Sequence, residues 1–297
     1  GDIIRKLPDS FVEIETDEDN NVYINCLNSK FKIKGDSAKE YPQIPDVNED
    51  KLYSIPQDVL KNMIKQTVFA TSQDQTKPIL MGELLEIENG NINLVAIDGY
   101  RFAVRSCQVD NLIHEDLKAK IIIPGKTLID VNSLLSSEEE VKVGFNEKNA
   151  IFIINDTKIV TRLLEGEFID YKKLCPREYN SKIKLKTKDL LNSIERASLL
   201  SQSEQNNLIK LSIRDSMMAI TSNNEKGNVY EEVALSLEGD YLDIAFNSRY
   251  LLEGLKNIDC EEIYIEFTTN VNPCIIKPAD GTKYTYLLLP VRISSNN

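Results

Sequence analysis

The chain has 297 residues, of which 41% are hydrophobic and 28% are charged, and its formal net charge is −12. We expect a cytoplasmic protein, because no apolar run approaches the ~20 residues that span a bilayer and no signal peptide opens the chain. The acidic balance argues against a protein that grips nucleic acid by neutralising phosphates, although it leaves open one that surrounds nucleic acid loosely.

Few residues of the chain are suited to catalysis. The only histidine, His114, lies in the polar stretch NLIHEDLK, and the chain has no glycine-rich phosphate loop and no GxSxG motif. The cysteines show no CxxC spacing, which favours reduced thiols over disulfides or zinc. We therefore predict a protein without catalytic residues, metal or cofactor. The five scattered cysteines are Cys26, Cys107, Cys175, Cys260 and Cys274.

The first elements are a helix-like stretch at 1–10 and three short strands within 10–34. Apolar residues alternate with polar ones along these strands, which are separated by the turns DEDNN and LNS. A strand such as 11–15 has one apolar face, and we expect that face to be buried against a helix.

An amphipathic helix is predicted at 57–72, where apolar positions recur with the spacing of one helix face. That stripe consists of Leu60, Met63, Ile64, Thr67 and Val68. Further along, Asp98-Gly99 predicts a tight turn between strands at 92–96 and 102–104, because glycine tolerates a positive φ.

The same elements then return. Helix-like stretches at 125–137 and 247–259 each precede a set of strands, at 140–164 and 261–293, and a second amphipathic helix at 187–202 matches the one at 57–72. Read by itself, the final segment YLLLPVRI is an edge strand ended by Pro290, with Arg292 at the surface.

This order of elements predicts an α+β fold repeated at a period of about 120 to 130 residues. The copies span 1–47, 48–177 and 178–297, and the first contains only the second half of the unit. About 70 residues are therefore expected to be missing from its front. Antiparallel sheets with helices on one face, joined edge to edge, would give an arc of helices backed by sheet.

Five segments carry a resemblance to the bacterial DNA polymerase III β subunit family, the sliding clamps. The segments are TVFATSQDQTKPILMGELLEI (67–87), LVAIDGYRFAV (94–104), LEGEFIDYKKL (164–174), FNSRYLLEGL (246–255) and YLLLPVRI (286–293). The resemblance covers the whole chain. It implies three clamp domains per subunit, the first partial here, and two subunits closing head-to-tail into a ring around DNA. Helices would line the inner face of that ring, and antiparallel sheets would form its outside.

The resemblance also implies an apolar groove that binds short peptides of DNA polymerases and of other replication or repair factors. Ile97 and Ile169 replace residues that are often smaller or more polar, which would narrow the groove, and the tail 294–297 could cover part of it. The implied groove residues are Leu80, Ile97, Gly99, Tyr100, Arg101, Phe102, Ile169, Leu174, Asn247, Tyr250, Leu287, Leu289, Pro290, Val291 and Arg292.

A DNA-facing lining and a dimer interface follow from the same resemblance. The helix at 57–72 carries a charge of +1 and the helix at 187–202 carries none, so they are only less acidic than the chain as a whole. Such a lining suits loose, sequence-independent contact with double-stranded DNA. The expected DNA-facing residues are Arg5, Lys6, Lys61, Lys65, Arg196, Arg249 and Lys256, and the expected interface residues are Phe31, Ile33, Leu199 and Leu200. Because half of the first domain is absent, we expect the dimer to be weakened or lost.

The resemblance implies further partners, namely the DNA polymerase III α subunit, other polymerases and the clamp loader. Two other functions remain open on the residues alone. A metal-dependent hydrolase could use Glu261, Glu262 and Glu266, or the run 138–140, although adjacent acids on a strand point to opposite faces. A scaffold could use the same repeat without DNA.

Overall fold

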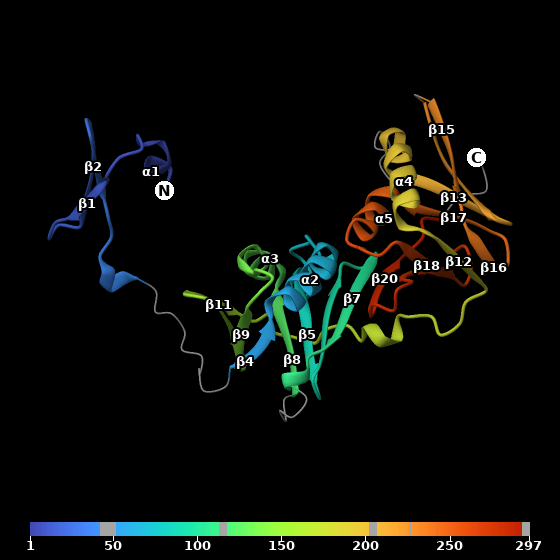
Figure 1. Ribbon diagram of the computed structural model, residues 1–297, viewed down its shortest axis with the longest axis horizontal. Coiled ribbons are helices and arrows are strands. Elements are labelled where there is room, and N and C mark those ends of the chain that lie inside the picture. Colours follow the sequence, from blue (N-terminus) through green and yellow to red (C-terminus); the bar gives the residue numbers. More distant parts are fainter. Residues whose placement is uncertain (42–51, 113–117, 202–206, 226, 293–297) are drawn as a thin grey trace. The chain divides into compact units, whose positions relative to one another are not determined.

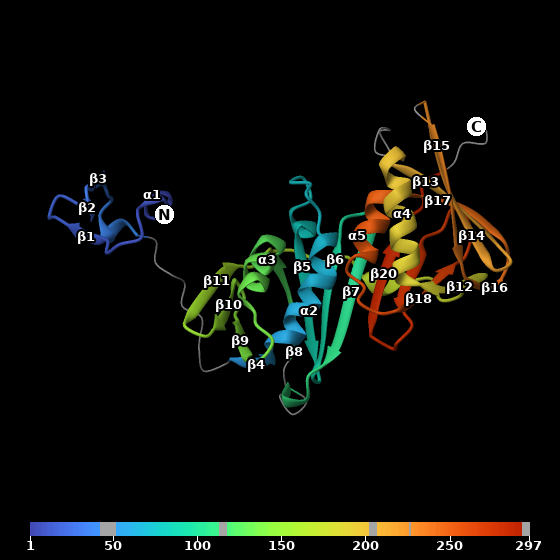
Figure 2. The ribbon, with the colours of Figure 1, turned by 45° about the horizontal axis from the view of Figure 1, so that its top comes forward.

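The computed structural model describes residues 1–41, 52–112, 118–201, 207–225 and 227–292. They belong to two compact units that divide after residue 46, and each unit is described by itself. Figures 1 and 2 show the first unit in dark blue and the second from light blue to red. His114 and the tail 294–297 lie outside the described residues.

The first unit is small and its described residues bury little. It contains a five-residue helix and a three-stranded antiparallel sheet. Only Ile24 and Cys26 are buried there, whereas Ile14 is 58% exposed and Phe11, which precedes the first strand, is 98% exposed. The expectation that the apolar face of 11–15 packs against a helix is therefore wrong, because the short helix buries none of its own residues. The elements are α1 (Asp2–Lys6), β1 (Glu13–Thr16), β2 (Asn21–Cys26), β3 (Ser29–Lys34) and the 3₁₀ turn η1 (Ala38–Glu40).

The second unit contains the predicted repeat twice, each time as strand, helix, strands, helix and three strands. The first copy consists of β4 (Tyr53–Pro56), α2 (Gln57–Thr67), β5 (Gly82–Glu88), β6 (Asn91–Ile97), β7 (Arg101–Gln108), β8 (Lys118–Pro124), α3 (Gly125–Leu134), β9 (Glu140–Phe145), β10 (Asn149–Ile154) and β11 (Thr157–Arg162). The second consists of β12 (Ser181–Lys186), α4 (Thr187–Ser201), β13 (Leu208–Arg214), β14 (Met217–Asn224), β15 (Gly227–Ala234), β16 (Ser236–Gly239), β17 (Leu242–Asn247), α5 (Ser248–Leu255), β18 (Glu262–Phe267), β19 (Cys274–Pro278) and β20 (Tyr284–Leu288). Short 3₁₀ turns η3 (Val68–Ala70), η4 (Pro78–Met81), η5 (Asp110–Leu112) and η6 (Tyr171–Lys173) connect them.

Three antiparallel sheets form this unit, and one of them joins the two copies. Four-stranded sheets of order β11-β10-β9-β4 and β15-β14-β13-β17 flank a nine-stranded sheet of order β16-β12-β18-β19-β20-β7-β6-β5-β8. The copies meet where β20 pairs with β7, with Leu287 opposite Phe102. This pairing confirms the edge-to-edge junction, but it also shows that the final strand is internal, so the edge-strand reading of YLLLPVRI is wrong.

The helices cover one face of the sheets (Figure 1). Four residues of the predicted stripe are buried on α2, with Leu60, Met63, Ile64 and Thr67 at most 3% exposed, whereas Val68 follows the helix in η3 and is half-buried. Gln66 of the same helix is also buried, at 7% exposure. Helix α2 packs on β6 and β7, and α4 packs on β14 and β15. Burial of each large aliphatic side chain contributes roughly 1.5–3 kcal/mol, so these faces hold each copy together.

The opposite face of the nine-stranded sheet carries a smaller apolar cluster. The segment 163–175, which links the two copies, lies over it and contributes Phe168 and Tyr171 to the cluster. Tyr171 packs edge-on against Phe102 with ring centroids 6.5 Å apart, and its hydroxyl donates to Glu86 Oε2 at 2.7 Å. These contacts fix the linking segment on the sheet, beside the site described next.

Candidate functional site

An apolar groove of about 230 Å³ opens where three segments that are distant in sequence meet. The segments are the β6–β7 hairpin, the linking segment and the end of β20. Phe102 and Leu287 are buried at the base of the groove, whereas Ile169 and Leu174 are 43% and 42% exposed at its edge. The lining consists of Ile97, Gly99, Tyr100, Arg101, Phe102, Ile169, Leu174, Pro273, Leu287 and Leu289. Nine of these ten residues were expected from the sequence.

The hairpin turn forms one wall of the groove and its conformation is fixed by Asp98. The Oδ1 atom of Asp98 accepts hydrogen bonds from the backbone N–H groups of Tyr100, at 2.8 Å, and Arg101, at 3.1 Å. Gly99 has φ +98°, the left-handed region that the predicted Asp-Gly turn requires. The backbone N–H of Leu289 donates to the carbonyl of Tyr100 at 2.9 Å, which attaches the C-terminal segment to the turn.

The guanidinium of Arg101 points into the protein. Its side chain is only 5% exposed and lies between the hairpin and α5. It donates to Asp98, to Glu253 and to the carbonyl of Phe69, at 2.9, 2.5 and 2.9 Å. It also lies 4.5 Å from the centroid of the Tyr250 ring. Burial alone would lower the pKa of Arg101, but Tyr286 and the two carboxylates raise it above its usual value, so the cation is held firmly.

The other expected groove residues surround the groove without lining it. Tyr250 stacks on Tyr100, with centroids 5.9 Å apart and planes at 23°. Asn247 caps α5 by accepting from the N–H groups of Arg249 and Tyr250. Leu80 belongs to the buried cluster beneath the groove.

The expected residues 290–292, at the C-terminal end of the described chain, also lie outside the groove lining. Pro290 is half-buried, Val291 donates its N–H to the carbonyl of Ala245 at 2.8 Å, and Arg292 is exposed.

Pro273 lines the groove, although the sequence did not indicate it. It precedes β19 and reaches the groove because Cys274 pairs with Leu288, one residue from two lining positions. The only sequence signal was a proline placed directly before a strand. The groove forms beside this strand only because β20 also pairs with β7, whose residues lie far away in the chain, and a local pattern does not reveal that pairing.

Most of the expected DNA-facing cations are engaged with acidic groups. Lys65 binds Asp259 at 3.0 Å and thereby connects the helical faces of the two copies, and Lys256 binds Glu195 at 2.8 Å. Lys61 instead donates to the carbonyl of Leu135 at 2.7 Å. No partner is found for Lys6 within the described part of the chain. The remaining pairs are Arg5 with Asp2, Arg196 with Glu231 and Arg249 with Glu253.

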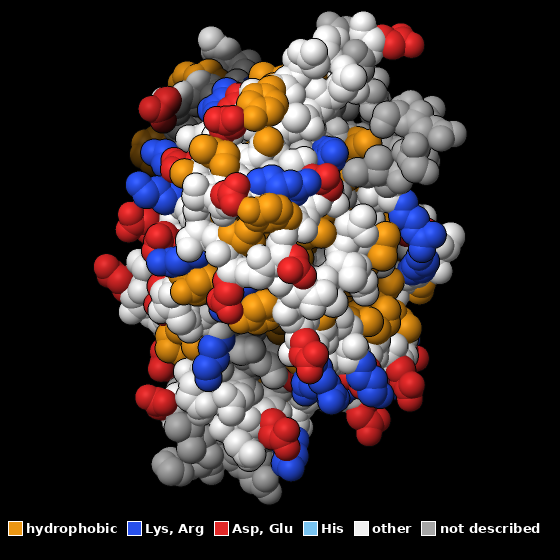
Figure 3. All heavy atoms as spheres, turned by 90° about the vertical axis from the view of Figure 1, so that its right-hand side faces the viewer, with side chains coloured by type: hydrophobic (Ala, Val, Ile, Leu, Met, Phe, Trp, Pro, Cys, Tyr) orange, Lys and Arg blue, Asp and Glu red, His pale blue; other side chains and the backbone are white. Residues whose placement is uncertain are grey.

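The residues expected at a dimer interface are more exposed than a core would be. Leu199 is 72% exposed on α4 and Leu200 is half-buried. Leu199 is therefore not a core residue of this chain. Phe31 and Ile33, on the edge strand β3, are 39% and 40% exposed. From the side of the C-terminal copy, apolar side chains lie in small groups among interspersed acidic and basic ones (Figure 3).

The acidic clusters considered for a metal-dependent hydrolase are not arranged for metal binding. Glu262 is paired with Lys184 and Glu266 with Lys182 and Lys277. Among the residues that the structure describes, no group of three or more histidine, cysteine or acidic side chains could hold a metal ion, and all five cysteines are free. No described helix is both long and apolar enough to cross a membrane.

Comparison with known families matches almost the whole chain. Three family models match in sequence: the N-terminal domain of the DNA polymerase III beta subunit at 1–45, its central domain at 54–170 and its C-terminal domain at 172–292. The beta sliding clamps of Staphylococcus epidermidis and Staphylococcus aureus are 37% and 36% identical over 294 residues, which is 98% of this chain and 77% of each relative.

Solved structures agree. The DNA polymerase sliding clamp of Bacillus subtilis matches 99% of this chain and 78% of its own with a TM-score of 0.93 and 35% identity. The beta chain of DNA polymerase III from Streptococcus pneumoniae matches 98% of this chain and 78% of its own with a TM-score of 0.90 and 28% identity.

Proposed function

Because this chain belongs to the DNA polymerase III beta subunit family, the bacterial sliding clamps, we propose that it tethers its partners to DNA through the apolar groove. A sliding clamp is a processivity factor, an accessory subunit that does not polymerise DNA itself. The proposal concerns which residues of this chain hold the partners and which face the DNA.

The groove supports this proposal best. It is a preformed concavity with an almost entirely apolar lining, bounded by a rigid hairpin turn and by the half-exposed side chains of Ile169 and Leu174. Such a site suits a short peptide whose apolar side chains fill the groove while its backbone bonds to the edges. We expect affinity in the micromolar range, because a short flexible peptide loses conformational freedom when it binds.

The partners proposed from the family are the DNA polymerase III α subunit, other DNA polymerases and the clamp loader, acting in the cytoplasm. Double-stranded DNA would pass along the face that carries the helices. The cations on that face are mostly paired with carboxylates, as Lys65 is with Asp259. In exposed pairs of this kind, the cation can exchange its carboxylate for a DNA phosphate at little cost in free energy. This suits contact with a sliding duplex whatever its base sequence. Leu199 with Leu200, and Phe31 with Ile33, are the proposed contacts in a head-to-tail homodimer.

Fluorescence polarisation with a labelled peptide from the C-terminal tail of a polymerase III α subunit tests the groove. Leu174→Ala should weaken binding about tenfold, because Leu174 contributes an exposed part of the lining. Leu134→Ala is the matched control, since Leu134 is 45% exposed on α3, outside the groove. Equal affinity for the two variants would overturn the assignment of the groove.

A further inference from the structure

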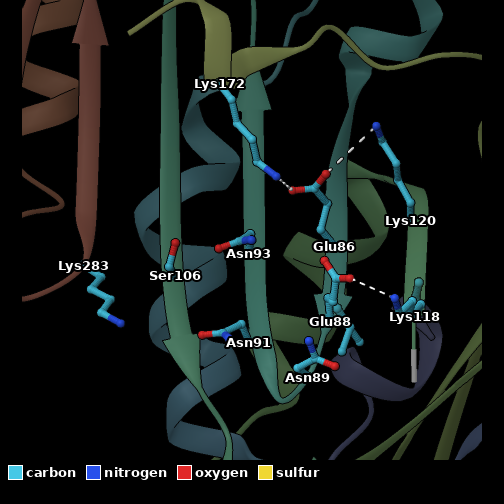
Figure 4. Close-up of a pocket in the computed structure, with 12 residues that line it drawn as sticks. Glu86, Glu88, Asn89, Asn91, Asn93, Ser106, Lys118, Lys120, Lys172 and Lys283 are labelled. Carbon is cyan, nitrogen blue, oxygen red and sulfur yellow. Dashed lines mark ion pairs between the residues drawn. The ribbon is translucent and has the colours of Figure 1, made fainter. Parts of the chain in front are cut away.

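A second concavity, of about 620 Å³, lies on the sheet face opposite the helices. Strands β5 to β8 form its floor, and we refer to it as the lysine recess (Figure 4). Its lining includes four lysines and only two glutamates, in a chain whose net charge is −12. Asparagine side chains and Ser106 add neutral hydrogen-bonding groups. The complete lining is Glu86, Ile87, Glu88, Asn89, Asn91, Asn93, Ser106, Lys118, Ala119, Lys120, Lys172 and Lys283.

The lysines are available to a ligand. Lys118 binds Glu88 at 3.1 Å, and Lys120 and Lys172 share Glu86 at 4.0 and 3.5 Å. The three lysine side chains are 63–68% exposed, so these pairs are solvent-screened and contribute little to stability. Lys283 makes no ion pair with any carboxylate in the described part of the chain, and Figure 4 shows it on the opposite side of the recess from Lys118.

The lysine recess and the apolar groove lie on the same sheet face. Phe102 in the groove and Ser106 in the recess are four residues apart on β7, which corresponds to about 13 Å. The linking segment lies between them: its Leu174 lines the groove, whereas its Lys172 points into the recess (Figure 4). About four extended residues would connect the two sites.

We infer that the lysine recess binds an acidic segment of the same partner chain whose apolar residues occupy the groove. This inference rests on the proposed function. An aspartate- or glutamate-rich stretch complements the four lysines, and its backbone amides can bond to the asparagine side chains. A nucleic acid fits less well, because the recess lining contains no aromatic ring on which a base could stack.

The test uses three versions of the labelled α-subunit tail peptide. One is unmodified, and the others carry a four-residue Gly-Ser spacer followed by either four aspartates or four asparagines. In low salt we expect the aspartate peptide to bind about fivefold more tightly than the asparagine peptide. The difference should disappear in 0.5 M salt, where the screening length falls to about 4 Å.

Two double variants locate the effect. Lys120→Gln with Lys283→Gln should abolish the gain while leaving Lys172, which belongs to the linking segment, in place. Lys142→Gln with Lys148→Gln removes the same charge from exposed positions on the neighbouring sheet and its turn, and should preserve the gain. Equal binding of the aspartate and asparagine peptides, or an equal loss in both double variants, would overturn the inference.

Two further outcomes distinguish failure of this inference from failure of the proposal that the apolar groove binds the partner peptide. Failure of the unmodified peptide to bind would refute the groove, and the inference would fall with it. If the unmodified peptide binds and the aspartates add nothing, only the inference is wrong. A ten-residue oligothymidine could also compete with the aspartate peptide. If it does, and if the competition is lost in the double variant Lys120→Gln with Lys283→Gln, the recess would instead be assigned to single-stranded nucleic acid.

Discussion

Arg101 on β7 reaches Glu253 on α5, with Nη1 2.5 Å from Oε2, and so joins the two copies beside the groove. The two residues are 152 positions apart in the chain. Glu253 also accepts from Arg249 at 2.8 Å, but Arg249 approaches from solvent and is 71% exposed. The same carboxylate therefore has one buried and one exposed cation.

The buried cation should matter far more than the exposed one. Arg101→Ala removes the guanidinium that donates to Asp98 Oδ2 and to the Phe69 carbonyl, and should lower the free energy of unfolding by about 3 kcal/mol, within the range for breaking a buried pair. Arg249→Ala should change it by less than about 1 kcal/mol. Urea unfolding followed by circular dichroism measures both. If the two variants lose similar amounts of unfolding free energy, the burial of Arg101 does not determine its contribution to stability.

The stack of Tyr100 on Tyr250 should couple the hairpin to α5. Alanine substitution of each residue singly and of both together forms a double-mutant cycle, and we expect a coupling free energy of about 1 kcal/mol. Tyr230→Ala combined with Tyr100→Ala is the control cycle, because Tyr230 lies on β15 and is exposed. A coupling of zero between Tyr100 and Tyr250 would mean that the stack adds nothing to the junction.

Glu83 should make stability depend on pH. It is fully buried, and Thr67 Oγ1 lies 2.6 Å from its Oε2 and 2.8 Å from the Met63 carbonyl. The single hydroxyl proton can serve only one of these acceptors, so a protonated Glu83 satisfies the arrangement best. Burial raises the pKa of Glu83 from 4.5 to about 8, although the hydrogen bond from Thr67 opposes the shift.

The raised pKa gives the sign of the effect. Between pH 4.5 and about 8 the folded state keeps a proton that the unfolded state has released, so stability should fall as pH rises, by up to about 1.4 kcal/mol per pH unit. Glu83→Gln should remove this dependence, whereas Glu88→Gln, whose side chain is 63% exposed in the native chain, should keep it. The urea midpoint of unfolding, measured from pH 5 to 9, is compared for the native chain, Glu83→Gln and Glu88→Gln. If the midpoints of all three proteins change with pH in the same way, the prediction is contradicted.

The sequence predicted the repeat because helix and strand periodicities are local. Residues such as Leu60 and Ile64 show their buried face by spacing alone, and the Asp98-Gly99 turn follows from the backbone freedom of glycine. Nearly all of the groove lining was also predicted, but only through the family resemblance. Hydrophobic patterns do not indicate that segments around 97, 169 and 287 converge.

Long-range contacts account for what the sequence missed. The strand Tyr284–Leu288 has the pattern of an edge strand, and only its pairing with β7 makes it internal. Arg101 was expected as a groove residue, yet its guanidinium bonds to Glu253 and to the Phe69 carbonyl, which no local signal reveals. For Phe11 the sequence pattern predicted a contact that does not form. Its alternating neighbours suggested a buried strand face, but no described element covers it and its side chain is 98% exposed.

Hydrogen–deuterium exchange with and without the α-subunit tail peptide tests the groove most directly. The peptide should slow amide exchange in the segments that line the groove, at 97–102, 169–174 and 287–289, and leave the helix at 125–134 unchanged. Protection that maps elsewhere, with no change in these three segments, would contradict the assignment of the groove as the site that tethers polymerases.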